Sequence, residues 1–233
     1  MRTVFLLLIY VLLTIVLFIL LLVFLPFGIR DPLLRISKWA MGLSAEILGI
    51  KIEVSGVDKI DHKTPYVYMA NHLSFLDGPM LFMLIPQLIR VILKKEVFRV
   101  PIIGQGMRYV RFVPVDRKGG RGGKKSIDKA ARLMREKGYS FLIFPEGTRS
   151  HDGRIQAFRR GGFFLALESQ ASVVPISIRG TYELMPRGTK FAKKGRVQVL
   201  FHAPVSVQGY DTTNMPGLMD RVKGIIESGL KGP

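Results

Sequence analysis

The chain has 233 residues, a formal net charge of +18 from 35 basic and 17 acidic side chains, and no cysteine. With 48% hydrophobic residues it is too apolar for a disordered protein, and its length suits one folded domain. Without cysteine there is no disulfide framework, thiolate nucleophile or cysteine-ligated metal centre. The positive charge predicts an anionic partner, which is nucleic acid, a phosphorylated substrate or an acidic membrane surface.

An apolar segment opens the chain. Residues 1–30 contain no acidic residue, and Val4–Leu25 consists almost entirely of Leu, Ile, Val and Phe. As a helix this stretch would be about 33 Å long, which matches the hydrocarbon core of a bilayer. A cleavable signal peptide is the alternative, but the following Leu25–Gly28 offers no small-residue cleavage site. We therefore predict that residues 1–50 anchor the protein to a membrane, with residues 4–25 spanning the bilayer or half-embedded in it.

The distribution of charge predicts an orientation. Residues 31–233 hold 33 of the 35 basic residues and all 17 acidic ones, a net charge of +16. Positive segments remain on the cytoplasmic side of a membrane, so we expect this part at the cytoplasmic face of the cytoplasmic membrane.

The segment after the apolar stretch predicts an amphipathic helix that begins near Pro32. Its apolar residues fall on one side: Leu33, Ile36, Ala40, Leu43 and Ile47. Lys38 and the single tryptophan, Trp39, lie beside this stripe. Such a helix fits a membrane interface or a place against the folded body, and both interpretations remain open.

From residue 51 on, short β-rich runs alternate with helical patterns. The expected strands are Lys51–Val57, Tyr66–Ala70, Arg90–Leu93, Arg111–Val115, Ser140–Phe144, Val173–Ile178 and Arg196–Phe201. The expected helices are Pro79–Ile85, Ser126–Lys137 with Ser126 as its N-cap, Gly162–Ser169 and residues 218–230. This alternation predicts that residues 51–233 form a single α/β domain with a central mixed sheet and flanking helices. The stretch 117–125 is expected to be a basic loop, and Pro175 to mark an edge strand or a bulge.

One of the four histidines directly follows an expected strand. His72 lies in the segment Asn71–Asp77 (NHLSFLD), at a strand end, where α/β sheets commonly bind ligands. Asp77 is five residues further on, so on a continuous helix the two side chains would lie on different faces. If the segment bends, the carboxylate can accept from one ring nitrogen and leave the other as a general base. The alternative is that Asp77 caps a helix and His72 is a core residue.

A second polar segment, FPEGTRS at residues 144–150, also follows an apolar strand. Its Gly147 permits close approach of the backbone, and Thr148 and Arg149 can bind a phosphate. Glu146 can accept from a hydroxyl or pair with a cation. The alternative is a polar turn with an internal pair between Glu146 and Arg149.

Together these segments resemble the glycerolipid acyltransferase family typified by 1-acyl-sn-glycerol-3-phosphate acyltransferases. The family's first motif is Asn-His followed by four residues and Asp, and Asn71, His72 and Asp77 match it. Its third motif, Phe-Pro-Glu-Gly-Thr-Arg-Ser, is matched in full by residues 144–150, with Pro145 in second place.

The other two family motifs are less specific. The apolar run Phe112–Arg117, which ends in Asp-Arg, is similar to the second motif. The apolar strand around Pro175 is similar to the fourth. The resemblance covers about residues 60–205, and some members of the family dock on membranes through a paired-helix element rather than a full span.

The resemblance implies a role for each matched residue. His72 would be the base that takes the proton from the acceptor hydroxyl, and Asp77 would orient its ring. Arg149 and Arg117, with Lys95 as a weaker third cation, would hold the acceptor phosphate. The acceptor site would be shaped by Glu146, Gly147 and Thr148.

The activity implied is direct transfer of a fatty acyl group to the sn-2 hydroxyl of lysophosphatidic acid, giving phosphatidic acid in phospholipid biosynthesis. The donor would be a thioester of coenzyme A or of acyl-carrier protein, and no resident cofactor is expected. No metal site is expected either, because His72 and Asp77 lack further ligands at the usual spacings. Ser74 is not expected to carry the acyl group, because no Gly-x-Ser-x-Gly elbow surrounds it.

Alternatives from other classes remain. Within the family, the acceptor could be another lysophospholipid or a lyso-aminolipid. A lipid hydrolase would use the same histidine–aspartate pair with water. A membrane-tethered nucleic-acid binder would explain the charge of +18, but the chain has no helix-turn-helix, zinc finger or RNA-binding aromatic signature. Nucleic acid is therefore not expected as a partner.

Overall fold

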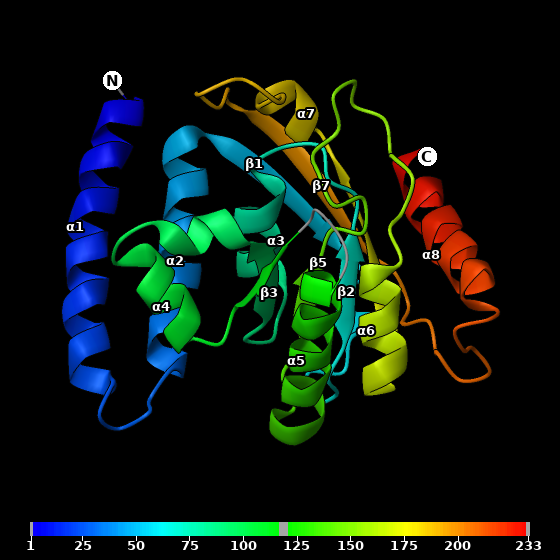
Figure 1. Cartoon of the computed structure of the whole chain (residues 1–233). Coiled ribbons are helices and arrows are strands. Elements are labelled where there is room, and N and C mark those ends of the chain that lie inside the picture. The colour runs from blue at the N-terminus through cyan, green and yellow to red at the C-terminus, as the bar shows by residue number, and fades with distance from the viewer. Residues whose placement is uncertain (1, 117–120, 232–233) are drawn as a thin grey trace.

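A mixed seven-stranded sheet forms the centre of the computed structural model, which describes residues 2–116 and 121–231 (Figure 1). The strands are β1 (Ile50–Ser55), β2 (Val67–Ala70), β3 (Arg90–Lys94), β4 (Val113–Val115), β5 (Phe141–Ile143), β6 (Val173–Arg179) and β7 (Gly195–Phe201). Their order across the sheet is β1-β7-β6-β2-β5-β3-β4, and only β6 and β7 are antiparallel neighbours. The predicted mixed sheet is confirmed. Strands β6, β2, β5, β3 and β4 all end at the same edge of it.

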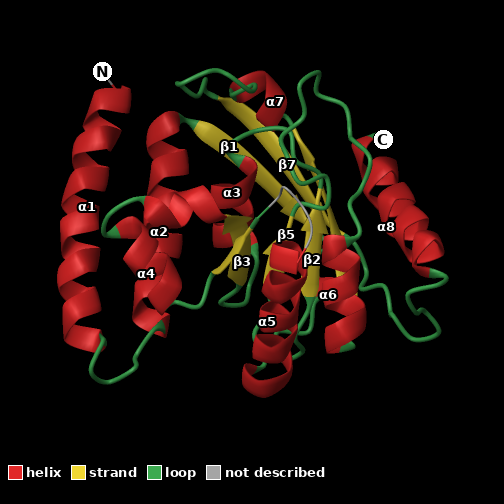
Figure 2. Ribbon diagram, viewed as in Figure 1, coloured by secondary structure: helices red, strands yellow, loops and turns green. Residues whose placement is uncertain are grey.

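Helices cover both faces of the sheet, as predicted (Figure 2). On one face lie α5 (Arg121–Lys137), α6 (Gly161–Ser169) and α8 (Met215–Leu230). On the other lie α2 (Asp31–Leu48) and α3 (Asp77–Leu84), with α1 (Arg2–Phe24) packed against α2 and against α4 (Ile103–Tyr109). The remaining helices are short: α7 (Thr181–Leu184) and the 3-10 helices Val57–Lys59 and Lys95–Arg99. The sequence patterns did not predict α4 or α7.

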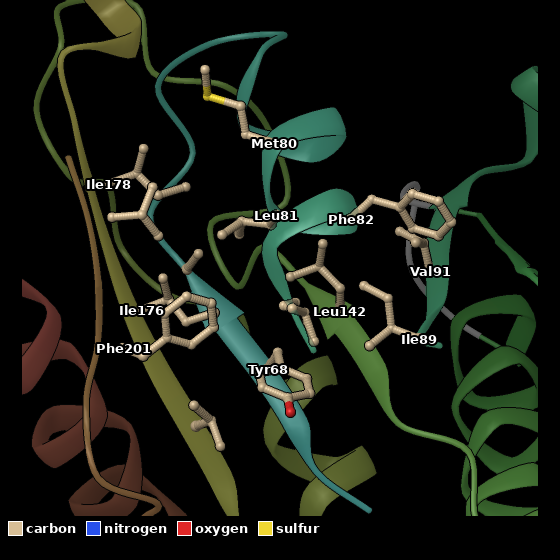
Figure 3. Packing of buried hydrophobic residues seen from close by; sticks show 14 of the residues in the cluster. Tyr68, Met80, Leu81, Phe82, Ile89, Val91, Leu142, Ile176, Ile178 and Phe201 are labelled. Carbon is tan, nitrogen blue, oxygen red and sulfur yellow. The ribbon is translucent and has the colours of Figure 1, made fainter. Parts of the chain in front are cut away.

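The central strands are apolar on both sides because each side meets a layer of helices. In β2, Tyr68 belongs to the layer under α3, whereas Val67 and Met69 belong to the layer under α6. Figure 3 shows the first of these layers, in which Tyr68 and Leu142 lie among the side chains of α3, such as Leu81. Side chains on both faces therefore fix the ends of β2 and β5, from which the polar segments emerge.

Polar contacts attach the N-terminal helix pair to the body. The Tyr109 hydroxyl of α4 lies 2.7 Å from the carbonyl oxygens of Phe24 and Ile29, in the turn between α1 and α2. The Lys38 ammonium of α2 donates to the carbonyl of Ile85, directly after α3. Because Lys38 is partly buried there and lies near Arg35, its pKa is lowered.

Of the two interpretations of residues 31–47, the structure supports packing on the folded body. The side chains Leu33, Leu34, Ala40 and Ala45 are buried, whereas Trp39 is 65% exposed. Within the part of the chain that the structure describes, no helix has the length and hydropathy of a membrane span, so the predicted spanning helix is not supported.

Two local predictions need correction. The stretch 121–125 was expected in a loop, but it forms the first turns of α5, while residues 117–120 lie outside the described residues. Ser126 is not the N-cap: its hydroxyl contacts the carbonyl oxygens of Gly122, one turn earlier, and of Pro114 in β4. The hydrogen bond from Ser126 to Pro114 attaches α5 to the sheet, and the helix begins at Arg121 rather than at the predicted Ser126.

Pro175 does not mark an edge strand, because β6 lies between β2 and β7. It does lie at a bulge: Ile176 pairs with Phe201 and Val173 with Val205, so the partner segment has one extra residue opposite Pro175. The β6–β7 ladder begins at the pair Ile176–Phe201, one residue after Pro175. The missing N–H of Pro175 therefore falls just outside that ladder, while its carbonyl still accepts from the His202 N–H at 3.0 Å. An interior strand tolerates proline here because the regular pairing with the neighbouring segment is interrupted at this position and resumes at Val173.

The side chain of Asn71 continues the sheet beyond the end of β2. Its Nδ2 donates to the Ile178 carbonyl at 2.9 Å, and its Oδ1 accepts from the Ile178 N–H at 2.8 Å. Asn71 is fully buried, so water cannot replace these bonds. The amide thus fixes the backbone directly before His72.

Replacement of this amide should destabilise the fold. We expect Asn71→Ala to lower the free energy of unfolding by about 2–4 kcal/mol, because two buried backbone groups lose their partners. Asn214→Ala is the matched control, since that asparagine also makes two side-chain hydrogen bonds to backbone, but at an exposed site. Urea denaturation of both variants measures the difference, and equal losses would contradict the role given to burial.

Candidate active site

The polar segments converge because their strands are parallel and end at one edge of the sheet. His72 follows β2 and Glu146 follows β5, the direct neighbour of β2. Lys94 ends β3 and Asp116 follows β4, the next two strands along. This is the edge at which α/β sheets bind ligands.

His72 and Asp77 form a hydrogen-bonded pair at this edge. The His72 Nδ1 lies 2.9 Å from Asp77 Oδ2. The segment bends between them, since residues 71–76 are outside any helix and α3 begins at Asp77. The imidazole stacks on the Phe144 ring at a centroid distance of 4.0 Å and an interplanar angle of 17°. With Nδ1 engaged by the carboxylate, Nε2 is the nitrogen left for a substrate.

Of the two alternatives for Asp77, the structure supports the pair with His72, because the N-cap position of α3 is Leu76 and no described side chain caps the helix. Asp77 is the first residue of α3, where the helix dipole favours a negative charge. Its Oδ2 also accepts from the backbone N–H groups of Leu73 and Ser74, each at 2.7 Å. Its side chain is fully buried, and its Oδ1 has no hydrogen-bond partner among the described residues. The backbone of the bend before α3 therefore holds the carboxylate beneath the imidazole.

Glu146 is a second buried carboxylate, only 2% exposed. Its Oε1 accepts from the His72 backbone N–H at 2.7 Å, and its Oε2 accepts from the backbone and side-chain amides of Gln156 at 2.9 and 3.2 Å. Burial raises the pKa of Glu146, and these hydrogen bonds act in the opposite direction. The structure thus gives Glu146 a place in the backbone support of His72, rather than in a pair with Arg149.

Two arginines lie at the site without a carboxylate partner. Arg149 and Arg159 both line the cavity described below, and neither forms an ion pair with any described carboxylate. Arg159 lies across Gly147, where its Cδ and Nε would be 2.8 Å from an added Cβ, and Gly147 has a φ of +74°. Only glycine suits this position, because it needs both the left-handed conformation and the close approach. Sequence reasoning missed Arg159 because it lies outside the motifs, ten residues after Arg149.

The remaining predicted cations have different positions. Lys95 forms an ion pair with Asp116, between the ends of β3 and β4. Its neighbour Lys94 is the lysine that lines the cavity. Arg117 lies outside the described residues.

The other motif residues support the site: Pro145 also lines the cavity, whereas Thr148 and Ser74 do not. The Pro145 carbonyl accepts from the Arg159 N–H at 2.7 Å, which positions that arginine. The Thr148 hydroxyl lies 3.4 Å from Arg187 Nη1, a contact to the loop after α7. The buried Ser74 hydroxyl donates to the Met185 carbonyl at 2.8 Å, so it is engaged as a structural donor.

A largely apolar cavity of about 780 Å³ opens at His72. One end has the imidazole with Arg149 and Arg159, and the walls extend to α1, α2 and α4. The apolar wall includes Leu17, Leu21, Leu33, Met41, Phe82 and Met107. A cavity of this size and lining accepts a long apolar group whose polar end stays at the imidazole.

The fold and the site together define an α/β enzyme. Its site consists of a histidine–aspartate pair, two arginines and an apolar cavity that His72 and both arginines line. The chain belongs to the acyltransferase family, whose family model matches residues 51–179. The predicted resemblance is thereby confirmed.

Named relatives agree with this assignment. The chain is 38% identical over 157 residues to the chloroplastic 1-acyl-sn-glycerol-3-phosphate acyltransferase LPAT1 of Arabidopsis thaliana, a match over 66% of this chain and 44% of that protein. It is 30% identical to 1-acyl-sn-glycerol-3-phosphate acyltransferase of Limnanthes alba, over 81% of this chain and 66% of the relative. The chain thus spans less than half the length of its Arabidopsis relative.

A solved structure shares the whole fold. The crystal structure of the 1-acyl-sn-glycerophosphate (LPA) acyltransferase PlsC from Thermotoga maritima superimposes with a TM-score of 0.74 and 25% sequence identity. The match covers 100% of this chain and 99% of that one, so it includes the N-terminal helix pair as well as the sheet.

The raised pKa of Glu146 predicts a pH dependence of stability. A carboxyl whose folded-state pKa is raised stabilises the fold most when it is protonated, below its ordinary value of 4.5. Relative to Glu146→Gln, we therefore expect the wild-type free energy of unfolding to fall as the pH rises from about 4.5 through the folded-state pKa. Urea denaturation across this range measures the difference. Glu136→Gln, at an exposed glutamate, is the matched control, and a pH-independent difference at Glu146 would contradict the raised pKa.

Proposed function

We propose that the protein transfers a fatty acyl group from an acyl thioester to the sn-2 hydroxyl of 1-acyl-sn-glycerol-3-phosphate and so makes phosphatidic acid. The observation that carries this proposal is the hydrogen-bonded His72–Asp77 pair at the polar end of an apolar cavity. The names of the relatives and of the structural neighbour support the same acceptor.

The geometry supports direct transfer with His72 as the general base. Nε2 takes the proton of the acceptor hydroxyl while that oxygen attacks the thioester carbonyl. The tetrahedral intermediate then expels the thiolate, which leaves as the thiol with the proton from the imidazolium, and the new ester remains. Asp77 stabilises the imidazolium through Nδ1, as in a serine-hydrolase triad whose serine is replaced by the substrate hydroxyl.

Arg149 and Arg159 are the groups that would bind the acceptor phosphate. A guanidinium binds phosphate through two parallel N–H donors, and two arginines without carboxylate partners leave these donors free for a ligand. Lys94 adds a third positive charge at the same end of the cavity. Arg159 and Lys94 are thus added to the cations expected from the motifs, and Lys94 also lies 3.7 Å from a carboxylate oxygen of Glu96.

The apolar cavity supports a fatty acyl group as the transferred chain. A chain seated among Leu17, Leu33 and Met107 would place its carbonyl carbon at the His72 end. Both coenzyme A and acyl-carrier protein present the acyl group as a thioester, so either donor suits this cavity. The assay below therefore includes both.

A membrane-bound location is part of the proposal. The lipid acceptor resides in membranes, and α1 exposes apolar side chains that include Val11, Leu12, Ile15 and Ile19. The net charge of +16 over residues 31–233 favours the cytoplasmic face.

The first test is the loss of transfer in His72→Ala. We expect the rate of phosphatidic acid formation from labelled acyl thioester and lysophosphatidic acid to fall by about 10²–10⁴-fold, since a general base is removed. Thermal unfolding should change little, because the backbone N–H of residue 72 still donates to Glu146. His62→Ala, at an exposed histidine in a turn, is the matched control and should retain full activity.

Other outcomes of this assay would overturn the proposal. Acceptor-independent release of fatty acid by the wild type would indicate a hydrolase. Absence of turnover with either donor, but transfer to another lysophospholipid or a lyso-aminolipid, would replace the acceptor. Retention of activity by His72→Ala would remove His72 as the base.

The phosphate assignment has its own test. We expect Arg149→Ala and Arg159→Ala each to raise the KM for lysophosphatidic acid about 10- to 100-fold, the loss of one charge-assisted contact. With a monoacylglycerol acceptor, which has no phosphate, the variants should match the wild type. Arg154→Ala, in the same loop but not among the residues that line the cavity, is the matched control. Equal losses with both acceptors would show that the arginines do not recognise phosphate.

A further inference from the structure

The loop between α7 and β7 exposes one aromatic side chain among cations. Phe191 is 63% exposed, a high value for a phenylalanine in a folded domain. Its charged neighbours are all exposed and all positive: Arg187, Lys190, Lys193 and Lys194. Residues 183–195 contain one acidic side chain, the exposed Glu183 of α7, so their net charge is +3. We call residues 186–194 the basic loop.

The base of the basic loop is bonded to both catalytic segments. The buried Ser74 hydroxyl, between His72 and Asp77, donates to the carbonyl of Met185. Arg187 Nη1 lies 3.2 Å from the Arg149 carbonyl oxygen. These contacts place the loop beside the polar end of the cavity.

The basic loop also adjoins the N-terminal helix pair. The Gly195 N–H, at the end of the loop, donates to the carbonyl of Gly49, the C-cap of α2. Figure 1 shows α7 and this loop at the same end of the molecule as the C-terminus of α2. The basic loop and the C-terminus of α2 therefore lie at the same end of the molecule.

We propose that the basic loop docks on the surface of an anionic bilayer, with Phe191 inserted at the headgroup level and its flanking lysines bound to lipid phosphates. An aromatic ring between lysines is the composition of an interfacial membrane contact, in which burial of the ring and attraction to anionic lipid add together. An acidic protein surface would also attract the lysines. The exposed Phe191 ring favours a bilayer, because a membrane can bury the ring as well as bind the lysines.

Such docking has a consequence for the site. Because the base of the loop is bonded to residues 74 and 149, a docked loop would hold the polar end of the cavity at the level of the lipid headgroups. The phosphate of a membrane lipid would then lie near Arg149 without leaving the surface. The inference goes beyond acyl transfer, and membrane binding is measurable without turnover.

Co-sedimentation of the full chain with vesicles tests the proposal. One set of vesicles contains phosphatidylcholine alone and the other contains about one third phosphatidylglycerol. We expect the double variant Lys190→Glu/Lys193→Glu to bind the anionic vesicles at least about twentyfold more weakly than the wild type, at about fivefold for each lysine. The variant Lys129→Glu/Lys137→Glu, with the same change of net charge on exposed positions of α5, should lose less than about threefold. Turnover of detergent-dispersed substrates should be unchanged in both.

A fluorescence measurement reports on Phe191 itself. In a Trp39→Phe background, Phe191→Trp places the single tryptophan of the chain at the loop. We expect its emission to shift to shorter wavelength on anionic vesicles and to be quenched by lipids brominated near the headgroup. Unchanged emission, or equal vesicle binding by the two charge variants, would overturn the proposal. Loss of turnover with acyl-carrier-protein thioester alone, at unchanged vesicle binding, would identify the loop as a protein-docking surface instead.

Discussion

One carboxylate oxygen, Oδ2 of Asp77, accepts from the His72 ring and from the backbone N–H groups of Leu73 and Ser74. These bonds close the six-residue bend between β2 and α3 around the carboxylate. The side chain of Asn71 fixes the start of this bend through its two hydrogen bonds to Ile178. The end of the sheet, the bend and the first residue of α3 are therefore held together by polar contacts, and these contacts orient the imidazole.

A second buried carboxylate lies on the other side of His72. Glu146 accepts from the backbone N–H of His72, while Asp77 accepts from its ring, so two acids from neighbouring strands hold one residue. Burial of two carboxylates near each other is unfavourable unless N–H donors compensate it, and here backbone amides supply most of them. In the proposed reaction, Asp77 would stabilise the imidazolium through its contact with the ring, while Glu146 holds the backbone of the same residue.

The sequence patterns predicted the mixed sheet, the flanking helices and the contact between His72 and Asp77, because each depends on local periodicity or on the position of strand ends. They could not predict the cavity. Its wall combines α1, α2 and α4 with the strand ends, and no local sequence pattern shows which helices pack together. Arg159 was missed for the same reason: only the fold shows that it lies across Gly147. The predicted start of α5 was wrong. The hydroxyl of Ser126 bonds to the Pro114 carbonyl in β4, and this tertiary contact outweighs the low helix propensity of the glycines before it.

The position of α1 has a consequence for how the protein can be handled and how it can change. Leu17 and Leu21 of this helix line the cavity, while Val11, Leu12 and Ile19 point away from the body and are exposed. Helix α1 is therefore part of the cavity wall and is not only an attachment to its surroundings. A shortened chain prepared without α1 for ease of purification would lack one wall of its own active site. Mutations that change the outer surface of α1 can also change the shape of the cavity. The outer surface of this helix and the cavity are therefore expected to evolve together.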